Sequence, residues 1–344
     1  MSDAGRQLVA SGATPAEVIR RAEELESADW VAAVELLESA NRAVRSDEVE
    51  IALAALRHRA FGPLAAAPPD RAPAAPGSSP PVGESELAEC SLTDLTAAVL
   101  RAALLDHGCL LVRGALDAER ARALAEHIDL GFAAQEPTAD MGPAWWFPLE
   151  LDAPDAATLG RKWVRGGGGA LLADSPRLMA EVLDLYTDLG LRSIVSAYLG
   201  SRPVISANKC TLRRVSIARN GDWHQDGSFL GTGIRALNLW LTLTPCGVDA
   251  PGLDVVPKRF DEIVETGTGA ANFGWAVGPE VVERVSADVG VVRPSFDAGD
   301  MLLFDDLFLH RTAVEPEMTL ARHAIEMWSF AADAYPSGQV PLVW

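Results

Sequence analysis

Two potential metal ligands placed two residues apart constrain this chain more than any other feature of its sequence. His224 and Asp226 stand in Trp223-His224-Gln225-Asp226-Gly227, and His310 follows much later in Leu309-His310-Arg311-Thr312. On a β-strand, residues i and i+2 project from the same face, so the first pair can reach one metal ion together. The third ligand must come from a second segment that the fold brings alongside. Two imidazoles and one carboxylate are the ligand set of the facial triad that holds Fe(II) and leaves coordination positions open.

A second His-x-Asp triplet in the same chain provides an internal comparison. His127 and Asp129 follow an Ala-, Leu-, Arg- and Glu-rich run that predicts an α-helix. Residues two apart on a helix point about 200° apart around its axis, so they cannot share a metal ion. We therefore interpret His127 as a helix-surface residue, and the sequence predicts a metal site at His224, Asp226 and His310.

The segments around the first triplet predict β-strands. An alternating strand covers 236–243, a strand ending in proline covers 252–257, and a Gly-Asp turn leads into an apolar strand at 301–304. Upstream, helices are predicted from Ser91 to Gly108 and from Ser175 to about Leu199. Helices followed by antiparallel-type strands predict an α+β fold. We expect a double-stranded β-helix (a jelly-roll, cupin-like core) with flanking helices and a small N-terminal helical region.

The order of these segments resembles the phytanoyl-CoA dioxygenase family of Fe(II)- and 2-oxoglutarate-dependent oxygenases. The resemblance covers about residues 90–335: an opening strand in the segment 106–114, the His-x-Asp triplet, an Asn-x-Trp strand, a Pro-terminated strand, a Gly-Asp strand, the distal histidine and Arg322. One departure is visible, because Pro257-Lys258-Arg259-Phe260 stands where the family often has Gly-Ser-His after the strand.

The resemblance implies a role for individual residues. It implies Fe(II), 2-oxoglutarate and O2 as cofactor and co-substrates, with His224, Asp226 and His310 as the iron ligands. Arg322 would bind the far carboxylate of 2-oxoglutarate, as suits a planar bidentate guanidinium. Further co-substrate contacts are implied for Thr312, Trp240, Asn208 and Thr211.

Each of these residues also has an ordinary structural interpretation that the sequence leaves open. His310 can be a structural histidine near Asp305 and Asp306, and Arg322 can pair with Glu315 or Glu317. Thr312 and Trp240 can be ordinary strand packing.

The activity that the resemblance implies is hydroxylation of an unactivated C–H bond, with release of succinate and CO2. Halogenating relatives carry a small residue in place of Asp226, so the carboxylate favours hydroxylation; desaturation and cyclisation stay open. The substrate is expected to be a small molecule or a carrier-bound group. Two alternatives remain: a non-catalytic jelly-roll binding protein, and a metal-dependent cupin enzyme that does not use 2-oxoglutarate.

The N-terminal part of the chain has a different composition from the rest. Residues 1–61 carry helical signals, among them the capping-box pattern Thr14-Pro15-Ala16-Glu17. Residues 62–83 are rich in Pro, Ala and Gly and predict a poorly ordered linker, so 84–344 is the predicted oxygenase domain. The N-terminal helices are expected to pack on the core, to mediate dimerisation, or to dock a carrier protein or peptide.

Four consecutive glycines at 166–169 predict a mobile loop, with a lid over the site as one interpretation. Arg161, Lys162 and Arg165 precede it, and these cations either bind an anionic group of the substrate or stay solvated.

Composition excludes other classes of function. The net charge of −19 disfavours a nucleic-acid partner. No apolar run approaches the 18 residues of a membrane span, and the first residues lack a signal-peptide pattern. The four cysteines show no metal-binding spacing, so we expect reduced thiols and a cytoplasmic protein.

Overall fold

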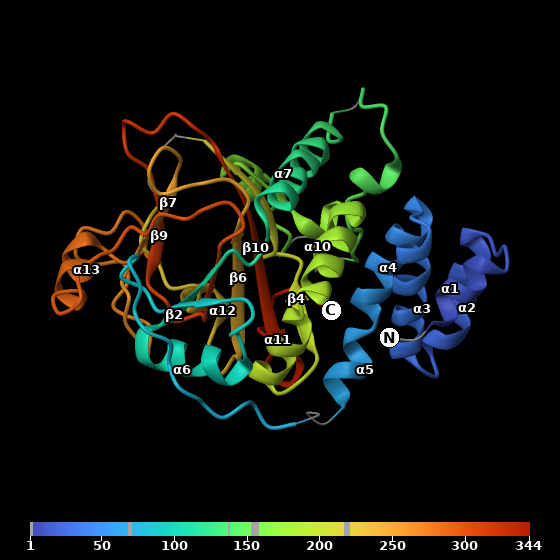
Figure 1. Ribbon diagram of the computed structural model, residues 1–344, viewed down its shortest axis with the longest axis horizontal. Helices are drawn as coiled ribbons and strands as arrows, with labels where there is room; N and C mark the ends of the chain where they lie inside the picture. The colour runs from blue at the N-terminus through green and yellow to red at the C-terminus, as the bar shows by residue number, and fades with distance from the viewer. Residues whose placement is uncertain (1–2, 68–70, 137, 153–157, 217–220) are drawn as a thin grey trace.

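The computed structural model describes residues 3–67, 71–136, 138–152, 158–216 and 221–344. A group of N-terminal helices lies beside a larger core built on a β-sheet (Figure 1). No helix in the described ranges is both long enough and apolar enough to cross a lipid bilayer.

Two sheets form the core. The larger has nine strands, in which β1, β2, β8, β6, β10, β4 and β11 are neighbours in that order and β5 joins β10 to β3. Its strands are β1 Glu89–Ser91, β2 Cys109–Arg113, β3 Gly169–Leu171, β4 Pro203–Ser206, β5 Thr211–Val215, β6 Ala236–Thr242, β8 Met301–Phe304, β10 Arg322–Ala331 and β11 Pro341–Val343. The smaller sheet pairs β7 Gly252–Val255 with β9 His310–Ala313. All pairs are antiparallel except β1 with β2.

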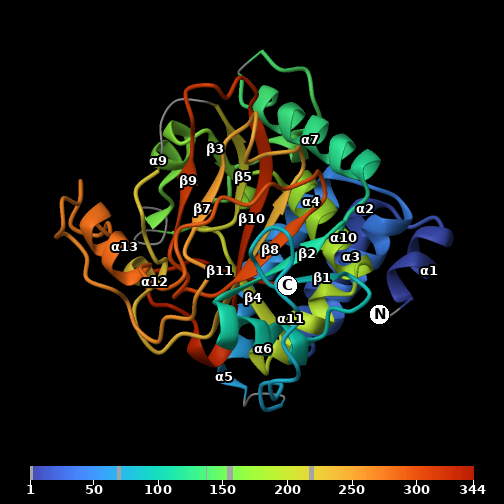
Figure 2. The same ribbon diagram turned by 60° about the vertical axis from the view of Figure 1, so that its left-hand side comes forward.

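Alternating side chains give the large sheet two apolar faces. On β6, Leu237, Leu239 and Leu241 enter one hydrophobic cluster, while Ala236 and Trp240 enter another. The first cluster continues into helices α6 Ala97–His107, α7 Ala118–Ala133, α10 Pro176–Asp188 and α11 Leu191–Leu199. The second contains side chains of β7. Helices therefore cover one face of the sheet, β7 and β9 lie against the other, and β10 runs through the centre (Figure 2).

Two helix boundaries differ from the prediction. The first core helix begins at Ala97, capped by the Thr96 side chain, rather than near Ser91, and it ends at Gly108 as predicted. The helix expected to run to Leu199 is two helices, because Gly190 adopts a left-handed conformation with φ +77° between them. A left-handed glycine is a common helix terminator.

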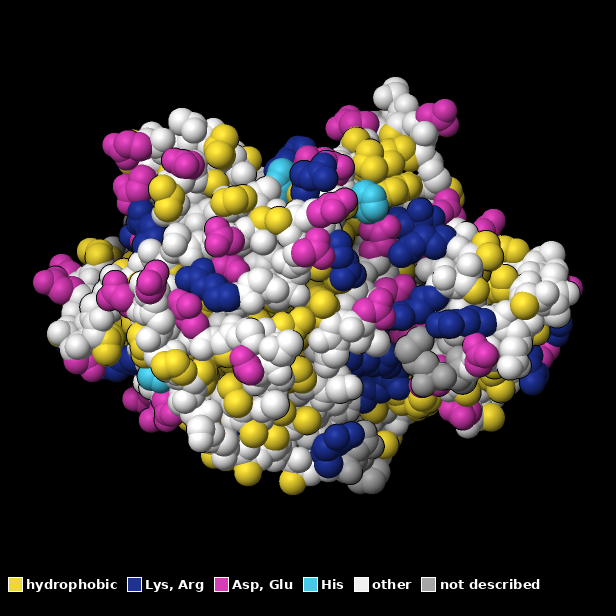
Figure 3. Space-filling view, in the orientation of Figure 1, with side chains coloured by type: hydrophobic (Ala, Val, Ile, Leu, Met, Phe, Trp, Pro, Cys, Tyr) yellow, Lys and Arg dark blue, Asp and Glu magenta, His cyan; other side chains and the backbone are white. Residues whose placement is uncertain are grey.

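The N-terminal helices pack against the core through an ionic junction. They are α1 Ala4–Ala10, α2 Pro15–Glu26, α3 Trp30–Ala43, α4 Asp47–Arg59 and α5 Phe61–Ala66. Helix α4 contacts α10 and β11. Arg177 of α10 binds Asp47 at 2.7 Å and Glu50 at 2.6 Å, and Arg42 binds Asp184 at 2.8 Å. Figure 3 shows acidic and basic side chains gathered where the N-terminal helices meet the core.

The segment predicted as a linker is tied to the core. Its first residues belong to α5, and residues 68–70 lie outside the described ranges. Ala74 N–H donates to Ala197 O at 2.8 Å, and Gly77 N–H donates to Ala98 O at 2.9 Å. These two hydrogen bonds place the described part of the segment against helices α11 and α6.

Candidate metal centre and its cavity

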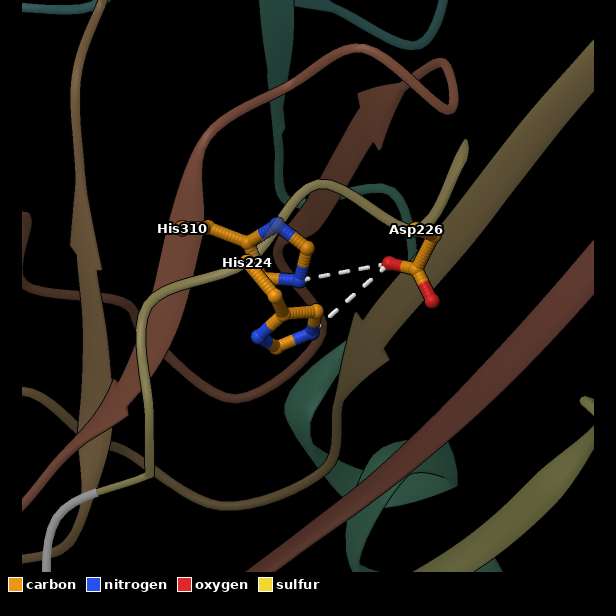
Figure 4. Close-up of side chains that lie close together, drawn as sticks. All are labelled: His224, Asp226 and His310. Carbon is orange, nitrogen blue, oxygen red and sulfur yellow. Dashed lines mark ion pairs between the residues drawn. The ribbon is translucent and has the colours of Figure 1, made fainter. Parts of the chain in front are cut away.

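The three predicted metal ligands converge on one point. Asp226 Oδ2 lies 3.8 Å from His224 Nε2 and 3.7 Å from His310 Nε2 (Figure 4). One ligand atom from each residue lies within 4.8 Å of the others. In the described part of the chain, no other group of three or more His, Cys, Asp or Glu side chains meets this criterion.

The chain reaches this arrangement by a route other than the strand that the spacing suggested. His224 forms an isolated β-bridge with His310, through N–H to O contacts of 3.0 and 3.1 Å. The backbone then turns into a helical conformation at Asp226, which precedes the short helix α12 Gly227–Leu230. Gln225, between the two ligands, is buried, and its amide donates to Leu307 O at 2.6 Å. The expectation of a strand is wrong, but the turn still brings both ligands together.

Backbone carbonyls fix the tautomers of both imidazoles. His224 Nδ1 lies 2.8 Å from Asp222 O, and His310 Nδ1 lies 3.0 Å from Phe308 O. Because a carbonyl oxygen only accepts, each Nδ1 carries hydrogen and each Nε2 presents a lone pair toward Asp226. Burial, with the neighbouring His224, lowers the pKa of His310 to about 4. The imidazole of His310 is therefore neutral, as a metal ligand must be.

The carboxylate of Asp226 is prepared for a cation. Burial alone would raise its pKa, but the positive charge of Lys209 brings the pKa below its usual value. Lys209 Nζ contacts Oδ1 at 3.2 Å, whereas the buried Oδ2 has no hydrogen-bond partner. An unpartnered buried carboxylate oxygen facing two imidazole lone pairs is a donor set that fits a divalent transition metal.

The ligands open into a cavity of about 1000 Å³ between the two sheets. All the residues predicted from the sequence to contribute to the site line it: His224, Asp226, His310, Arg322, Thr312, Trp240, Asn208 and Thr211.

Arg322 begins β10 and lies buried beside the metal ligands' cavity, with 2% exposure. Its Nη1 donates to Pro251 O at 3.2 Å and Gly252 O at 3.0 Å, while its Nε has no partner. The guanidinium lies 5.3 Å from the centre of the Trp240 ring. Burial lowers the pKa of Arg322 to about 10, so it stays positive at neutral pH. The alternative pairing with Glu315 is wrong, because Glu315 binds Arg293.

Asn208 and Thr211, two of the predicted co-substrate contacts, form hydrogen bonds with other groups of the protein. Asn208 Nδ2 donates to Thr158 O at 2.9 Å, and its Oδ1 accepts from Val340 N–H at 2.7 Å. Thr211 Oγ1 donates to Glu326 at 3.0 Å. Both Asn208 hydrogen bonds hold its loop, so the position of Asn208 at the cavity has a structural cause of its own.

Several cavity residues were not predicted from the sequence, among them Lys209, Arg213, Glu326, Phe229, Phe273 and Trp275. Period-two alternation along β5 would have placed Arg213 on the same face as Thr211. Glu326 lies on β10, four residues after Arg322, so the same alternation would have placed it on the face of Arg322. Lys209, Phe273 and Trp275 come from turns and loops and Phe229 from the short helix α12, and these segments have no periodic signal.

The comparison triplet behaves as predicted. His127 and Asp129 lie on α7, where His127 Nδ1 contacts Glu181 at 2.8 Å. Asp129 instead binds Arg214 at 3.0 Å and His323 at 3.1 Å. The two side chains therefore serve different neighbours and share no site.

The glycine run is a shorter loop than expected, because only Gly167 and Gly168 lie outside a helix or strand. Gly166 ends helix α9 Arg161–Gly166, and Gly169 begins β3. Gly168 has φ +74°, and a Cβ there would lie 2.6 Å from Arg214 O. Of the three cations, Arg161 binds Asp174 and Arg165 donates to Gln135, so Lys162 alone remains directed to the cavity's lining.

Several solved structures share the fold of this chain. EctD from S. alaskensis, in a structure with 2-oxoglutarate and 5-hydroxyectoine, matches 71% of this chain and 80% of its own at 18% identity and a TM-score of 0.50. The same protein with bound Fe matches equal shares at 17% identity and a TM-score of 0.50. SnoK, a non-heme alpha ketoglutarate dependent carbocyclase from nogalamycin biosynthesis, covers 72% of this chain and 89% of its own at 14% identity and a TM-score of 0.46. No family model and no curated protein sequence matches the chain.

Proposed function

We propose that this protein is an Fe(II)- and 2-oxoglutarate-dependent dioxygenase that hydroxylates an unactivated C–H bond of a small-molecule or carrier-bound substrate. One observation carries the proposal: two imidazole Nε2 atoms and an unpartnered carboxylate oxygen face one another in the cavity that also holds the buried guanidinium of Arg322. The shared fold with EctD, whose structures contain 2-oxoglutarate and Fe, supports the same assignment.

Fe(II), when bound there, would supply the oxidation chemistry: 2-oxoglutarate would lose CO2, and one oxygen atom of O2 would enter succinate and the other the product hydroxyl. The protein's own residues bind and orient. His224, Asp226 and His310 would hold the metal, and the ion pair with Lys209 keeps Oδ2 of Asp226 turned toward the imidazoles.

Arg322 is the proposed anchor of the far carboxylate of 2-oxoglutarate. Its Nε is without a partner, and two backbone carbonyls fix the rest of the guanidinium. Thr312, on strand β9 of the smaller sheet, lines the same cavity, and Trp240 lies against the guanidinium. A buried charged fork suits a carboxylate with two parallel hydrogen bonds.

The proposal extends to the architecture of the β-sheet core. We infer that the large sheet and the β7–β9 pair, with the cavity between them, form a double-stranded β-helix of the jelly-roll type. The N-terminal helices pack on α10 and β11 and are proposed to stabilise this core. A cupin enzyme without 2-oxoglutarate explains the metal ligands, but it leaves the unpartnered Nε of Arg322 without a use. A non-catalytic binding protein explains neither the converging metal ligands nor the unpartnered Nε of Arg322.

Anaerobic titration of the purified protein with Fe(II) and 2-oxoglutarate tests the proposal. We expect the weak visible charge-transfer band of the chelate, lost in His310→Ala and Asp226→Ala. The matched control is His127→Ala, which removes the histidine of the helical triplet and should keep the band. If the unmodified protein shows no band with both ligands in excess, the proposal is wrong.

A further inference from the structure

A wall of aromatic side chains extends outward from the metal ligands. Trp275 packs edge-on to His224, with ring centres 6.2 Å apart, and the ring of Phe229 lies 5.1 Å from that of Trp275. Phe273 stacks on Trp275 at 5.3 Å with planes 3° apart. All three side chains line the cavity. The wall is therefore one continuous surface that starts at an iron ligand.

Much of this wall is exposed, which is unusual for large apolar side chains in a soluble protein. Phe229 is 39% exposed and Phe273 47% exposed, and Trp163, on another segment of the cavity lining, is 76% exposed. A contiguous exposed apolar patch inside a cavity marks a ligand-binding surface. Flat π faces are matched best by another ring.

The loop that carries the wall is fixed to the metal-binding segment. Val277 N–H donates to Trp223 O at 2.8 Å, next to His224. Asn272 Nδ2 donates to Asp222 Oδ1 at 2.7 Å. Because both bonds reach the residues just before the first iron ligand, a ring held on this wall has a set position relative to the metal.

The cavity contains positively charged side chains that have no negatively charged partner. Lys209 pairs with Asp226, Arg322 is assigned to the co-substrate, and Asp222 and Glu326 already accept hydrogen bonds. Within the ranges that the structure describes, Lys162 and Arg213 line the cavity and have no carboxylate within ion-pair distance. Two unpaired cations in a chain of net charge −19 favour an anionic ligand group.

Building on the proposed function, we propose that the substrate is an anionic molecule with a flat ring system, its ring lying on Phe229, Phe273 and Trp275 and its anionic group bound by Lys162 and Arg213. A cavity of about 1000 Å³ holds both this molecule and 2-oxoglutarate. It is at the upper end of the usual range for small-molecule sites.

Calorimetric titration under anaerobic conditions, with Fe(II) and 2-oxoglutarate present, tests this substrate class with three matched probes. Naphthalene-2-carboxylate is flat and charged, naphthalene-2-carboxamide is flat and neutral, and decahydronaphthalene-2-carboxylate is charged but not flat. We expect the first to bind about tenfold or more tightly than either of the others.

Variants test the ring contact and the anion contact separately. Phe273→Leu, at a position that is 47% exposed, and Trp275→Leu should weaken naphthalene-2-carboxylate binding about tenfold. Phe147→Leu, which changes an exposed phenylalanine outside the cavity, should leave this binding unchanged. Lys162→Gln with Arg213→Gln should weaken the carboxylate and leave the carboxamide unchanged.

Equal binding of the flat and saturated carboxylates, or unchanged binding in Phe273→Leu, overturns the ring assignment. Equal binding of carboxylate and carboxamide overturns the anion assignment. The visible band of the iron chelate, recorded on the same samples, separates this inference from the proposed function. A band without ring binding overturns only the substrate class, and ring binding without a band overturns only the oxygenase assignment.

Discussion

Replacing Arg322 by glutamine should weaken 2-oxoglutarate binding about 100-fold or more. The guanidinium is 2% exposed, uses Nη1 on two backbone carbonyls and leaves Nε free. A carboxylate bound there gains two charge-assisted hydrogen bonds, each worth about 1.5–3 kcal/mol. Losing both costs about 3 kcal/mol or more, and each 1.4 kcal/mol is a factor of ten in Kd.

Comparison of two ligands separates this binding role from a structural one. Anaerobic titration of the Fe(II) protein, followed by the visible band, gives the affinity for 2-oxoglutarate and for 2-oxobutanoate, which lacks the far carboxylate. We expect Arg322→Gln to reduce only the first affinity strongly. Arg214→Gln is the control, because Arg214 lies on β5 but binds Asp129 outside the cavity.

An equal loss for both ligands would refute the reasoning. The main task of the arginine would then be to hold the carbonyls of Pro251 and Gly252, since those contacts are independent of which ligand is bound.

Three further predictions concern stability. Asp254→Asn, which weakens the carboxylate contacts of Arg293 and Arg311, should cost about 2 kcal/mol in chemical denaturation and weaken Fe(II) binding through strand β9; unchanged values would contradict this. Gly168→Ala should cost about 2 kcal/mol or more by the same assay, because φ is +74° and the added Cβ meets a carbonyl oxygen; a stabilised variant would rule out the strain. Burial alone raises the pKa of Glu38, but Arg57 and Arg192 bring the pKa below its ordinary value. The stabilising effect of Glu38 is therefore present above the unfolded pKa of about 4.5 and is lost as pH falls through the lower folded pKa. Circular dichroism of Glu38→Gln and of the unmodified protein should show a smaller acid-induced loss of stability in the variant.

Much of the site could be predicted because its ligands belong to short patterns. The His-x-Asp triplet, the distal histidine and Arg322 each stand at a fixed place relative to a strand, and all of them line one cavity. The local geometry was still mispredicted, since His224 and Asp226 are joined by a turn. Spacing of two fits a strand, but Gln225 is held inward by the Leu307 carbonyl, and only the folded neighbours supply that contact.

The glycine run at 166–169 and the single glycine Gly190 affect the local structure in different ways. A run of glycines predicts mobility because each residue has high conformational freedom. Here that freedom lets the chain approach β5 so closely that Gly168 O accepts from Arg214 N–H at 2.7 Å. A single glycine, Gly190, lies inside a helical pattern, but its left-handed conformation separates α10 from α11. Composition alone does not distinguish a flexible glycine from one required by close packing.

The substrate-facing side of the cavity shows where sequence reasoning must stop. The proposed metal ligand His310 and the proposed co-substrate contacts Arg322, Thr312 and Trp240 lie on strands whose periodicity assigns them to a face. Phe229, Phe273 and Trp275 come from a short helix and a long loop. Their convergence depends on hydrogen bonds such as Val277 to Trp223, between residues far apart in the chain. The same scaffold can therefore keep its metal chemistry while its loops change, and substrate preference in this chain has to be derived from the assembled wall and not from the motif.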